Sequence, residues 1–311
     1  MRRLIRWAWV VIGWNVATIL LGALVRATHS GAGCGRSWPM CRGEVLPELG
    51  GATTVEFIHR VASGLALALV ASLIVMVWRL VARRHPARRA VAWAGVAIAG
   101  EALIGAAIVL YEWVASDSSI GRAIAVPLHL VNTFVLLAAL TLTVWFLRGG
   151  GRLVARGALK GWVVVGALAL VAIAATGAVT ALADTLFPSE SVREGLAAVV
   201  TSTEHFLTRL RVLHPVLAFI AVSAAALATR LLGDPVLKRV RTILTLTLVQ
   251  MALGLLVIAL ASPWWARQLH LLVADLIWIS YVWFAAQTLS SNAVNSSMES
   301  TGARHVNPVH K

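Results

Sequence analysis

Four of the nine histidines stand inside long apolar stretches of the chain, where an ionisable side chain is costly and usually has a function. They are His59, His129, His214 and His270. Each follows the start of its apolar stretch by only a few residues, about 6–13 Å along a helix that rises 1.5 Å per residue. We therefore expect the four side chains at a similar depth, on four different helices.

A single histidine of this kind is usually a hydrogen-bonded packing residue, but pairs at matched depth favour another role. Two imidazoles that face each other across a helix bundle can bind one iron from both sides and hold a haem between them. His59 and His129 fall in the first half of the chain, and His214 and His270 in the second. The pattern predicts two haem sites with two ligands each.

A carboxylate accompanies only the first of these pairs. Glu56 lies three residues before His59, so a helix projects both side chains from nearly the same face. It could act as a general base beside a bound haem. It could instead pair with Arg60, or occupy the first helical turn because the helix dipole favours an acid there. The second half has Arg211 at the aligned position, which favours one reactive haem site and one unreactive site.

The only two cysteines, Cys34 and Cys41, share one glycine-rich loop, residues 31–47. A disulfide is the expected state of such a pair outside the cell. A redox-active dithiol and a metal site are alternatives, although no nearby His or Cys completes a metal ligand set.

Several arginines gather near the outer ends of the histidine-bearing stretches. Their guanidinium groups could bind haem propionates, because they match carboxylates in geometry and charge. Contact with lipid headgroups is the alternative. These residues are Arg60, Arg209, Arg211 and Arg267. Deeper in the apolar stretches, Glu101 and Asp275 are candidates for a proton path, with no partner evident from the sequence.

The elements that carry these residues are apolar segments of membrane-spanning length. The chain has 311 residues, of which 59% are hydrophobic and 13% charged. A soluble domain has about 25% charged residues. Segments of about 20 residues cross roughly 30 Å of hydrocarbon. We predict an all-α integral membrane protein with eight transmembrane helices at residues 7–27, 54–78, 91–111, 125–147, 161–182, 206–232, 241–262 and 267–289.

The basic residues predict how the helices are oriented. Eighteen of the 27 Lys and Arg residues lie in alternate connections and the termini, which places both termini in the cytoplasm. The net charge of +14 therefore reflects topology, and we expect no nucleic-acid partner. The start of the chain resembles neither a cleavable signal peptide nor a transit segment, which favours a bacterial plasma membrane. The polar tail, residues 291–311, is expected to be disordered.

The two halves of the chain repeat each other in four places and in the same order. We therefore predict two pseudo-symmetric four-helix bundles, residues 1–150 and 151–290, with one orientation in the membrane. The matched segments are Leu21-Gly22-Ala23 with Thr176-Gly177-Ala178, Ile58-His59-Arg60 with Leu213-His214-Pro215, Glu101 to Gly105 with Gln250 to Gly254, and Leu128-His129-Leu130 with Leu269-His270-Leu271.

Together these features resemble the haem A synthase family over about residues 5–290. The resemblance is carried by eight spans in two repeats, the Cys34–Cys41 pair, the segment Glu56-Phe57-Ile58-His59-Arg60, and one histidine in each of the other even spans. It implies oxidation of a methyl group of haem O to a formyl group, giving haem A for cytochrome oxidase.

The resemblance also implies roles for individual residues. Haem O would be the substrate at His59 and His129, and haem b the cofactor at His214 and His270, with Glu56 and the cysteines tied to activity. Haem O synthase, a farnesyltransferase, and an electron acceptor are the implied partners.

The chain departs from the family in two places. Pro215 replaces the arginine that normally follows the second-repeat histidine, and the connection 184–204 lacks the second cysteine pair that some relatives carry. Two other functions use the same histidines: a non-catalytic di-haem b cytochrome that exchanges electrons with quinone, and a transporter built from parallel repeats.

Overall fold

A computed structural model describes residues 1–154, 158–201, 203–232 and 234–290. In this part of the chain the regular elements are all helical, and no β-strand is formed. They are α1 (Arg2–Ala27), a one-turn 3₁₀ helix (Ser30–Ala32), α2 (Gly51–Leu80), α3 (Ala87–Leu110), α4 (Ile120–Leu147), α5 (Ala158–Leu186), α6 (Val192–Val200), α7 (Phe206–Leu210), α8 (Leu213–Leu232), α9 (Asp234–Ala259) and α10 (Trp264–Leu289).

Eight helical segments of the described chain are long and apolar enough to cross a membrane. The sixth of them combines α7 and α8. The predicted all-α membrane architecture with eight spans is therefore confirmed. The predicted tail, residues 291–311, lies outside the described residues.

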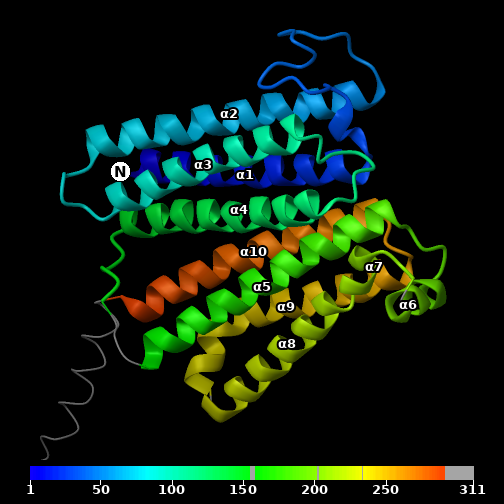
Figure 1. Cartoon of the computed structure of the whole chain (residues 1–311). Coiled ribbons are helices and arrows are strands. Elements are labelled where there is room, and N and C mark those ends of the chain that lie inside the picture. The colour runs from blue at the N-terminus through cyan, green and yellow to red at the C-terminus, as the bar shows by residue number, and fades with distance from the viewer. Residues whose placement is uncertain (155–157, 202, 233, 291–311) are drawn as a thin grey trace, which may run out of the picture.

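The long helices form two sets of four (Figure 1). In the first set, α1 packs on α2, α2 on α3, α3 on α4, and α4 back on α1. In the second, α5 packs on α8, α8 on α9, α9 on α10, and α10 back on α5. Each set thus closes a ring of neighbouring helices, while the predicted symmetry between the sets stays a prediction.

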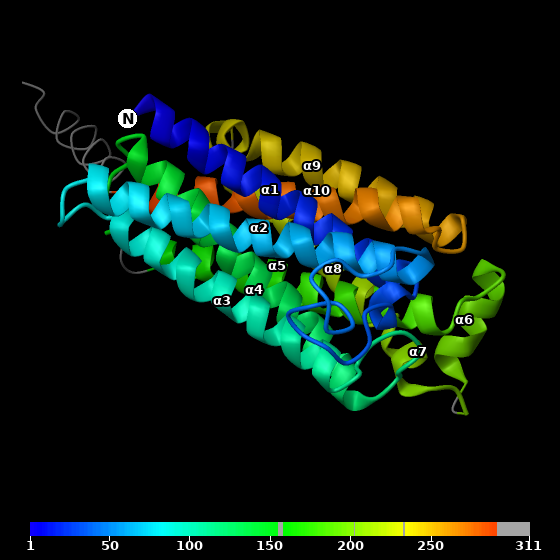
Figure 2. The same cartoon turned by 90° about the horizontal axis from the view of Figure 1, so that it is seen from above.

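The two sets meet where α4 packs on both α5 and α10 and where α1 packs on α10. Helices α4 and α10 lie in the middle of the molecule (Figures 1 and 2). Trp278 on α10 stacks on Phe134 of α4 with 4.9 Å between ring centroids. Its indole N–H donates to the Phe134 carbonyl at 2.7 Å. A second polar link runs from the Gln268 side-chain amide to the Leu20 carbonyl on α1, at 3.1 Å.

Two helix starts outside the predicted spans follow from local capping. Helix α4 starts at Ile120, five residues before the predicted 125, because the Ser119 hydroxyl accepts the Arg122 N–H. The short helix α6 lies within the predicted connection 184–204. There Ser191 accepts the Glu194 N–H, a Ser-x-x-Glu start signal that hydropathy does not detect.

The sixth span is interrupted just before its histidine. Helix α7 ends at Leu210 and α8 begins at Leu213, so Pro215 lies in the first turn of α8, where a missing N–H is tolerated. A residue with an N–H at position 215 would donate to the Arg211 carbonyl. In this chain the Thr180 hydroxyl of α5 donates to that carbonyl instead, at 3.4 Å.

Candidate functional site

The four intramembrane histidines lie at similar depths. His59 of α2 and His129 of α4 follow their helix starts by about 12–14 Å, estimated from the rise per residue. His214 follows the start of α7 by about 12 Å, and His270 follows the start of α10 by about 9 Å. Because these helices all begin at one face of the molecule, the structure places the four imidazoles in one layer.

His214 and His270 face each other within the second set of helices. Their ring centroids are 6.1 Å apart and their ring planes differ by 82°. Two imidazoles that share a metal ion at about 2 Å from each nitrogen have ring centres roughly 6 Å apart. Nδ1 of His214 lies 2.9 Å from the Ile173 carbonyl, which leaves Nε2 as its ligand nitrogen.

Three of the four rings rest against a glycine on the neighbouring helix. A Cβ atom at Gly22 would lie 2.9 Å from Cε1 of His59, and one at Gly177 would lie 2.9 Å from Cε1 of His214. At Gly254 the corresponding distance to Cε1 of His270 is 3.3 Å. These glycines therefore admit the rings, and a side chain at the first two would push the imidazole away.

The sequence contained these glycines only as markers of the repeat, and their contact with the histidines was not predicted. The sequence did contain a signal for this contact, because Gly22 and Gly177 stand at matching positions of the repeat, each one helix before the matching histidine.

The first histidine pair has a more polar setting. His59 and His129 are close enough to interact electrostatically, and Nδ1 of His59 is buried without a hydrogen-bond partner among the described residues. Nδ1 of His129 lies 2.8 Å from a carboxylate oxygen of Glu101 on α3. Glu101, for which the sequence suggested no partner, is thus a neighbour of a predicted ligand.

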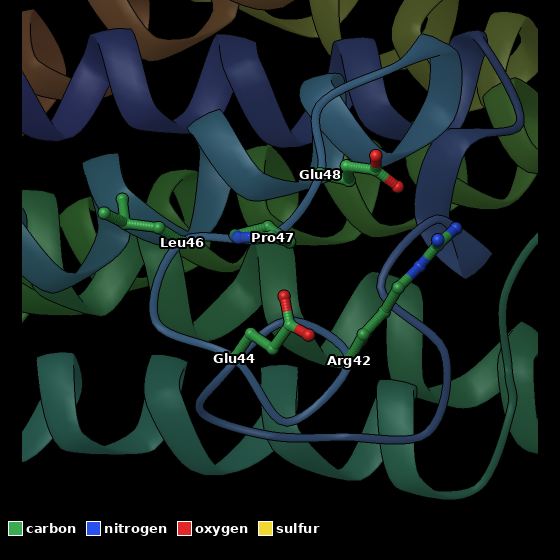
Figure 3. Close-up of a pocket in the computed structure, with 5 residues that line it drawn as sticks. All are labelled: Arg42, Glu44, Leu46, Pro47 and Glu48. Atoms are coloured by element: carbon green, nitrogen blue, oxygen red, sulfur yellow. The ribbon is translucent and has the colours of Figure 1, made fainter.

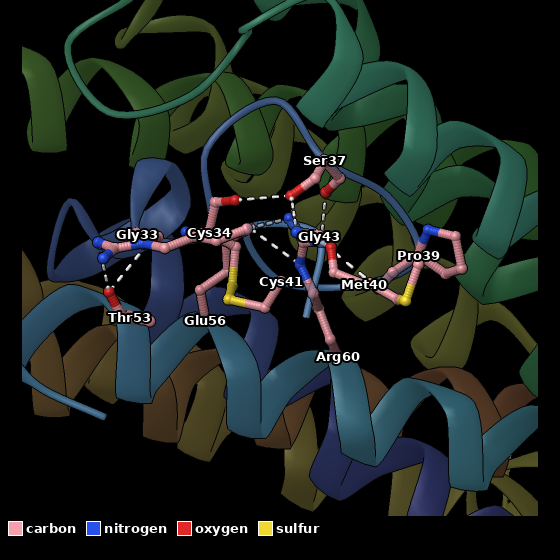
Figure 4. A network of polar contacts seen from close by, with 11 residues as sticks. Gly33, Cys34, Ser37, Pro39, Met40, Cys41, Gly43, Thr53, Glu56 and Arg60 are labelled. Atoms are coloured by element: carbon pink, nitrogen blue, oxygen red, sulfur yellow. Dashed lines mark hydrogen bonds and ion pairs between the residues drawn. A yellow bond between two sulfur atoms is a disulfide. The ribbon is translucent and has the colours of Figure 1, made fainter. Parts of the chain in front are cut away.

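The cysteine loop covers the outer end of α2 (Figure 4). Cys34 and Cys41 form a disulfide that is almost fully buried, at 0% and 1% exposure. This confirms the disulfide and leaves neither thiol free for a metal. A Cβ at Gly33 would lie 2.5 Å from the Ala52 carbonyl, so only glycine allows this close approach of the loop to α2.

Glu56 joins this loop to α2. One oxygen, Oε2, accepts the Cys34 N–H at 2.8 Å, and Oε1 accepts Nε and Nη2 of Arg60 at 3.1 and 2.6 Å. The carboxylate is buried, with 4% of the side chain exposed. A carboxylate has about four acceptor positions, so about one remains, on Oε2.

Arg60, a predicted propionate contact, is committed to protein partners. Besides Glu56, its guanidinium donates to the carbonyls of Ser37 at 2.6 Å and Met40 at 2.8 Å (Figure 4). The pairing of Glu56 with Arg60, one of the two alternatives from the sequence, is therefore present.

The other three predicted propionate contacts differ in what they bind. Arg211 forms an ion pair with Asp184 at 3.0 Å and donates to carbonyls at the end of α5. Arg267 donates to the Thr185 hydroxyl at 2.9 Å. Arg209 is exposed, and its side chain makes no hydrogen bond within the described residues.

A further arginine at this level was missed from the sequence. Arg26, near the end of α1, interacts electrostatically with Arg122, Arg267 and Asp184. Its Nε is buried without a hydrogen-bond partner among the described residues. Asp184 has three arginines as neighbours, Arg26, Arg211 and Arg267, which leaves an excess of positive charge at the outer ends of the helices.

Asp275 on α10 is the most deeply buried carboxylate of the described chain, with 0% exposure. Neither of its side-chain oxygens has a hydrogen-bond partner among the described residues. The structure thus shows no chain of polar groups leading to it, and its place in a proton path stays a prediction.

A surface pocket lies in the outer loop (Figure 3), and no histidine lines it. It is lined by Arg42, Glu44, Leu46, Pro47 and Glu48, none of which is a predicted site residue. Nowhere in the described residues do three or more His, Cys, Asp or Glu side chains gather around a possible metal position. A haem with two axial histidines requires only pairs, and its porphyrin supplies the remaining iron ligands.

The residues present fit a haem in the second set of helices. Two imidazoles stand at ligand spacing, one has its Nδ1 held by a carbonyl, and no hydrogen bond joins Nε2 of either ring to a described residue. The fold and these pairs define a polytopic helical membrane protein with intramembrane imidazole pairs suited to a tetrapyrrole.

The chain belongs to the cytochrome oxidase assembly protein family COX15-CtaA, which it matches over residues 5–54 and 51–282. Haem A synthase of Bacillus mycoides is 44% identical over 81 residues, which are 25% of this chain and 26% of that protein. A haem A synthase of Bacillus cereus has the same identity over the same length. The predicted family resemblance is confirmed.

Relatives that match over most of the chain carry a different name. Protoheme IX farnesyltransferase of Thermus thermophilus is 44% identical over 299 residues, 94% of this chain and 49% of that protein. The chain thus spans about half the length of these Thermus relatives.

Proposed function

We propose that this protein is a haem A synthase, which oxidises a methyl group of haem O to the formyl group of haem A for assembly of cytochrome oxidase. The single observation that carries the proposal is the family match over nearly the whole chain, in a protein whose four intramembrane histidines lie in one layer. The alternative, a non-catalytic di-haem b cytochrome, is not favoured, since the family and its Bacillus relatives are biosynthetic.

In this proposal the two histidine pairs have different tasks. His59 and His129 bind the iron of haem O, the substrate, and His214 and His270 bind haem b, the cofactor. A haem b at the second pair would supply a one-electron redox centre for electrons that leave the substrate. The paired rings at 6.1 Å and the hydrogen bond on His214 support this assignment.

The protein's own residues must also hold the carboxylate groups of the haems. Arg60 and Arg211 are occupied by acidic side chains and carbonyls, so among the predicted contacts Arg267 is favoured and Arg209 is the exposed candidate. Arg26, with its unpartnered Nε, joins Arg267 in this role. Arg guanidinium groups suit such carboxylates in geometry and charge.

Glu56 is proposed to accept a proton during methyl oxidation. When water supplies the formyl oxygen, protons and electrons are released in equal number, and the electrons pass to an acceptor outside this chain. The remaining acceptor position on Oε2 gives Glu56 the capacity to take a proton, while Arg60 and the Cys34 N–H hold the carboxylate in place.

Location and partners complete the proposal. The charge pattern supports both termini in the cytoplasm, the bacterial relatives support a bacterial plasma membrane, and the buried disulfide fits an oxidising outer face. The Thermus relatives are about twice as long as this chain and are named for farnesyl transfer to protoheme. We infer that their other half performs that transfer, and that a farnesyltransferase activity supplies haem O to this chain.

The direct test is to express the protein with a source of haem O and to extract the pigments. We expect haem A with the wild-type chain and none with His59→Ala or His214→Ala, measured by chromatography of the extracted haems. Haem b without haem A in wild-type membranes, with all four histidines required for binding it, would support the plain cytochrome.

Glu56→Gln tests the proton-accepting role, because it preserves volume but removes the ionisable group. We expect haem A formation to fall about 10²- to 10⁴-fold with haem b binding retained. The matched control is Thr53→Val, which removes the 2.9 Å bond between the Thr53 hydroxyl and the Gly33 carbonyl and loosens the same loop without touching the carboxylate. An equal loss in both variants would assign Glu56 to anchoring the loop instead.

A further inference from the structure

His129 differs from the other three histidines in what lies beside its ring. The others rest on a glycine of the neighbouring helix, whereas a Cβ atom at Gly105, the matching glycine of α3, would meet nothing within 4 Å. The ring of His129 contacts Glu101 instead, with 2.8 Å between Nδ1 and Oε2. Although Nδ1 and Oε2 are close, the carboxylate lies off the direction of the ring N–H, and Nδ1 therefore does not count as hydrogen-bonded. A small rotation of the His129 ring completes the hydrogen bond.

Glu101 is held in position by a second residue of α4. The Asn132 side-chain amide donates to Oε1 of Glu101 at 2.6 Å and to the Ala97 carbonyl at 2.8 Å. Asn132 lies three residues after His129, on the same face of α4. Helix α4 therefore presents both an imidazole and an amide to one carboxylate, which fixes its orientation inside the membrane.

The second set of helices lacks this arrangement. Gln250 stands where Glu101 aligns, and its side-chain oxygen is buried without a hydrogen-bond partner among the described residues. Val273 occupies the position of Asn132, three residues after His270. Nδ1 of His270 is buried without a hydrogen-bond partner among the described residues. The two sets thus share their histidines but differ by one carboxylate beside a ligand.

A carboxylate that accepts the Nδ1–H of a histidine fixes its tautomer, leaves the Nε2 lone pair for the metal, and increases the electron donation of the ring. We propose that Glu101 is a positioning residue, which acts through His129 on the haem at His59 and His129. Compared with an uncharged residue at position 101, it makes this haem bind more tightly and stabilises its ferric form. This inference rests on the proposed function, because it requires His129 to bind iron. It also gives the reaction a direction, since a lower midpoint potential at this site favours electron transfer away from it.

The test exchanges the two matched residues. Glu101→Gln gives the first set the residue of the second, and Gln250→Glu does the reverse. Each variant is made with the other set's ligands removed: Glu101→Gln with His214→Ala and His270→Ala, and Gln250→Glu with His59→Ala and His129→Ala. Haem b is the probe in both, because it binds iron ligands without depending on conversion of haem O.

We expect Glu101→Gln to weaken haem b binding about 10- to 100-fold, the usual effect of losing such an outer partner, and to raise the midpoint potential. The low-spin electron paramagnetic resonance spectrum should shift as well, because it reports the axial ligands and not merely a nearby charge. Gln250→Glu should lower the potential at the second site. In the single variant Glu101→Gln, an unchanged haem b spectrum from His214 and His270 shows that the protein is folded.

Two results would overturn the inference at different levels. Unchanged affinity, potential and spectrum in Glu101→Gln would remove the role of Glu101 while leaving the proposed function intact. Failure of the His59–His129 site to bind haem at all, in the chain with Glu101 present, would refute the ligand assignment and this inference with it.

Discussion

At the scale of residues, the site is built from imidazoles placed against helix surfaces that lack side chains. In α1 and α5 a glycine lies opposite a histidine at the same short distance. Protein interiors are packed closely enough that one added methyl group displaces a neighbour by a few tenths of an ångström. Ring orientation at these two positions therefore depends on the absence of one carbon atom.

Gly177→Ala is expected to weaken haem b binding at His214 by roughly 10-fold or more, because the added methyl group pushes the ring from its position. Gly22→Ala should do the same at His59. Binding is measured by titrating the purified apoprotein with haem b. Gly105→Ala is the control, since its methyl group meets nothing and should only favour the helix, by about 0.5–1 kcal/mol. Equal losses in Gly105→Ala and Gly177→Ala would show that packing on the histidine is not the cause.

At the scale of elements, the outer end of each histidine helix is held by contacts that differ between the two sets. On α2, the disulfide loop is attached through Glu56, Arg60 and Thr53. At α7 and α8 the same level is occupied by the ion pair of Arg211 with Asp184 and by the break before Pro215. The hydrophobic spans of the two sets are alike, and the sets differ in the polar contacts at their outer ends.

The break in the sixth span predicts a coupling between Thr180 and Pro215. Thr180→Val leaves the Arg211 carbonyl without its hydroxyl donor and should cost about 0.5–1.5 kcal/mol of unfolding free energy. In a Pro215→Ala background the new N–H can donate to that carbonyl, so the cost should largely vanish. Thermal denaturation of the four proteins in detergent gives the double-mutant cycle. Additive effects would mean that Pro215 does not determine the partner of this carbonyl.

At the scale of the whole molecule, the two sets of helices are joined by aromatic packing and a few interhelical hydrogen bonds. Without water in the bilayer, helix association depends on packing and on such bonds rather than on hydrophobic burial. The contact of Trp278 with Phe134 supplies both, at the centre of the α4–α10 interface.

Trp278→Phe should keep the aromatic stack and remove the N–H donor, at a cost of about 0.6 kcal/mol and at most about 1.7 kcal/mol, the mean and the maximum found for hydrogen bonds between membrane helices. The loss is read from circular dichroism during thermal unfolding in detergent. Trp264→Phe is the control, because Trp264 is 54% exposed at the outer end of the same helix. If both variants melt like the wild type, the indole hydrogen bond does not hold the two sets together.

The sequence alone was enough to determine the number of spans, the position of four histidines inside them, and the disulfide. These depend on signals carried by single residues or short windows: apolar length, an ionisable group in an apolar run, and the two cysteines of one loop. The helix breaks and the extra helix α6 required capping and proline chemistry, which average hydropathy does not register.

Only the tertiary structure decided which side chains meet across helices. Glu56 and Arg60 are four residues apart, so their pairing could be predicted from helix geometry, whereas Glu101 and His129 come from different helices. Their meeting depends on the rotation of α3 and α4 about their axes, which is set by the packing of many small residues together. The same holds for Gly177 under His214 and for Arg26, whose Nε has no hydrogen-bond partner among the described residues, because each of these environments is formed by two or more helices and by no single segment.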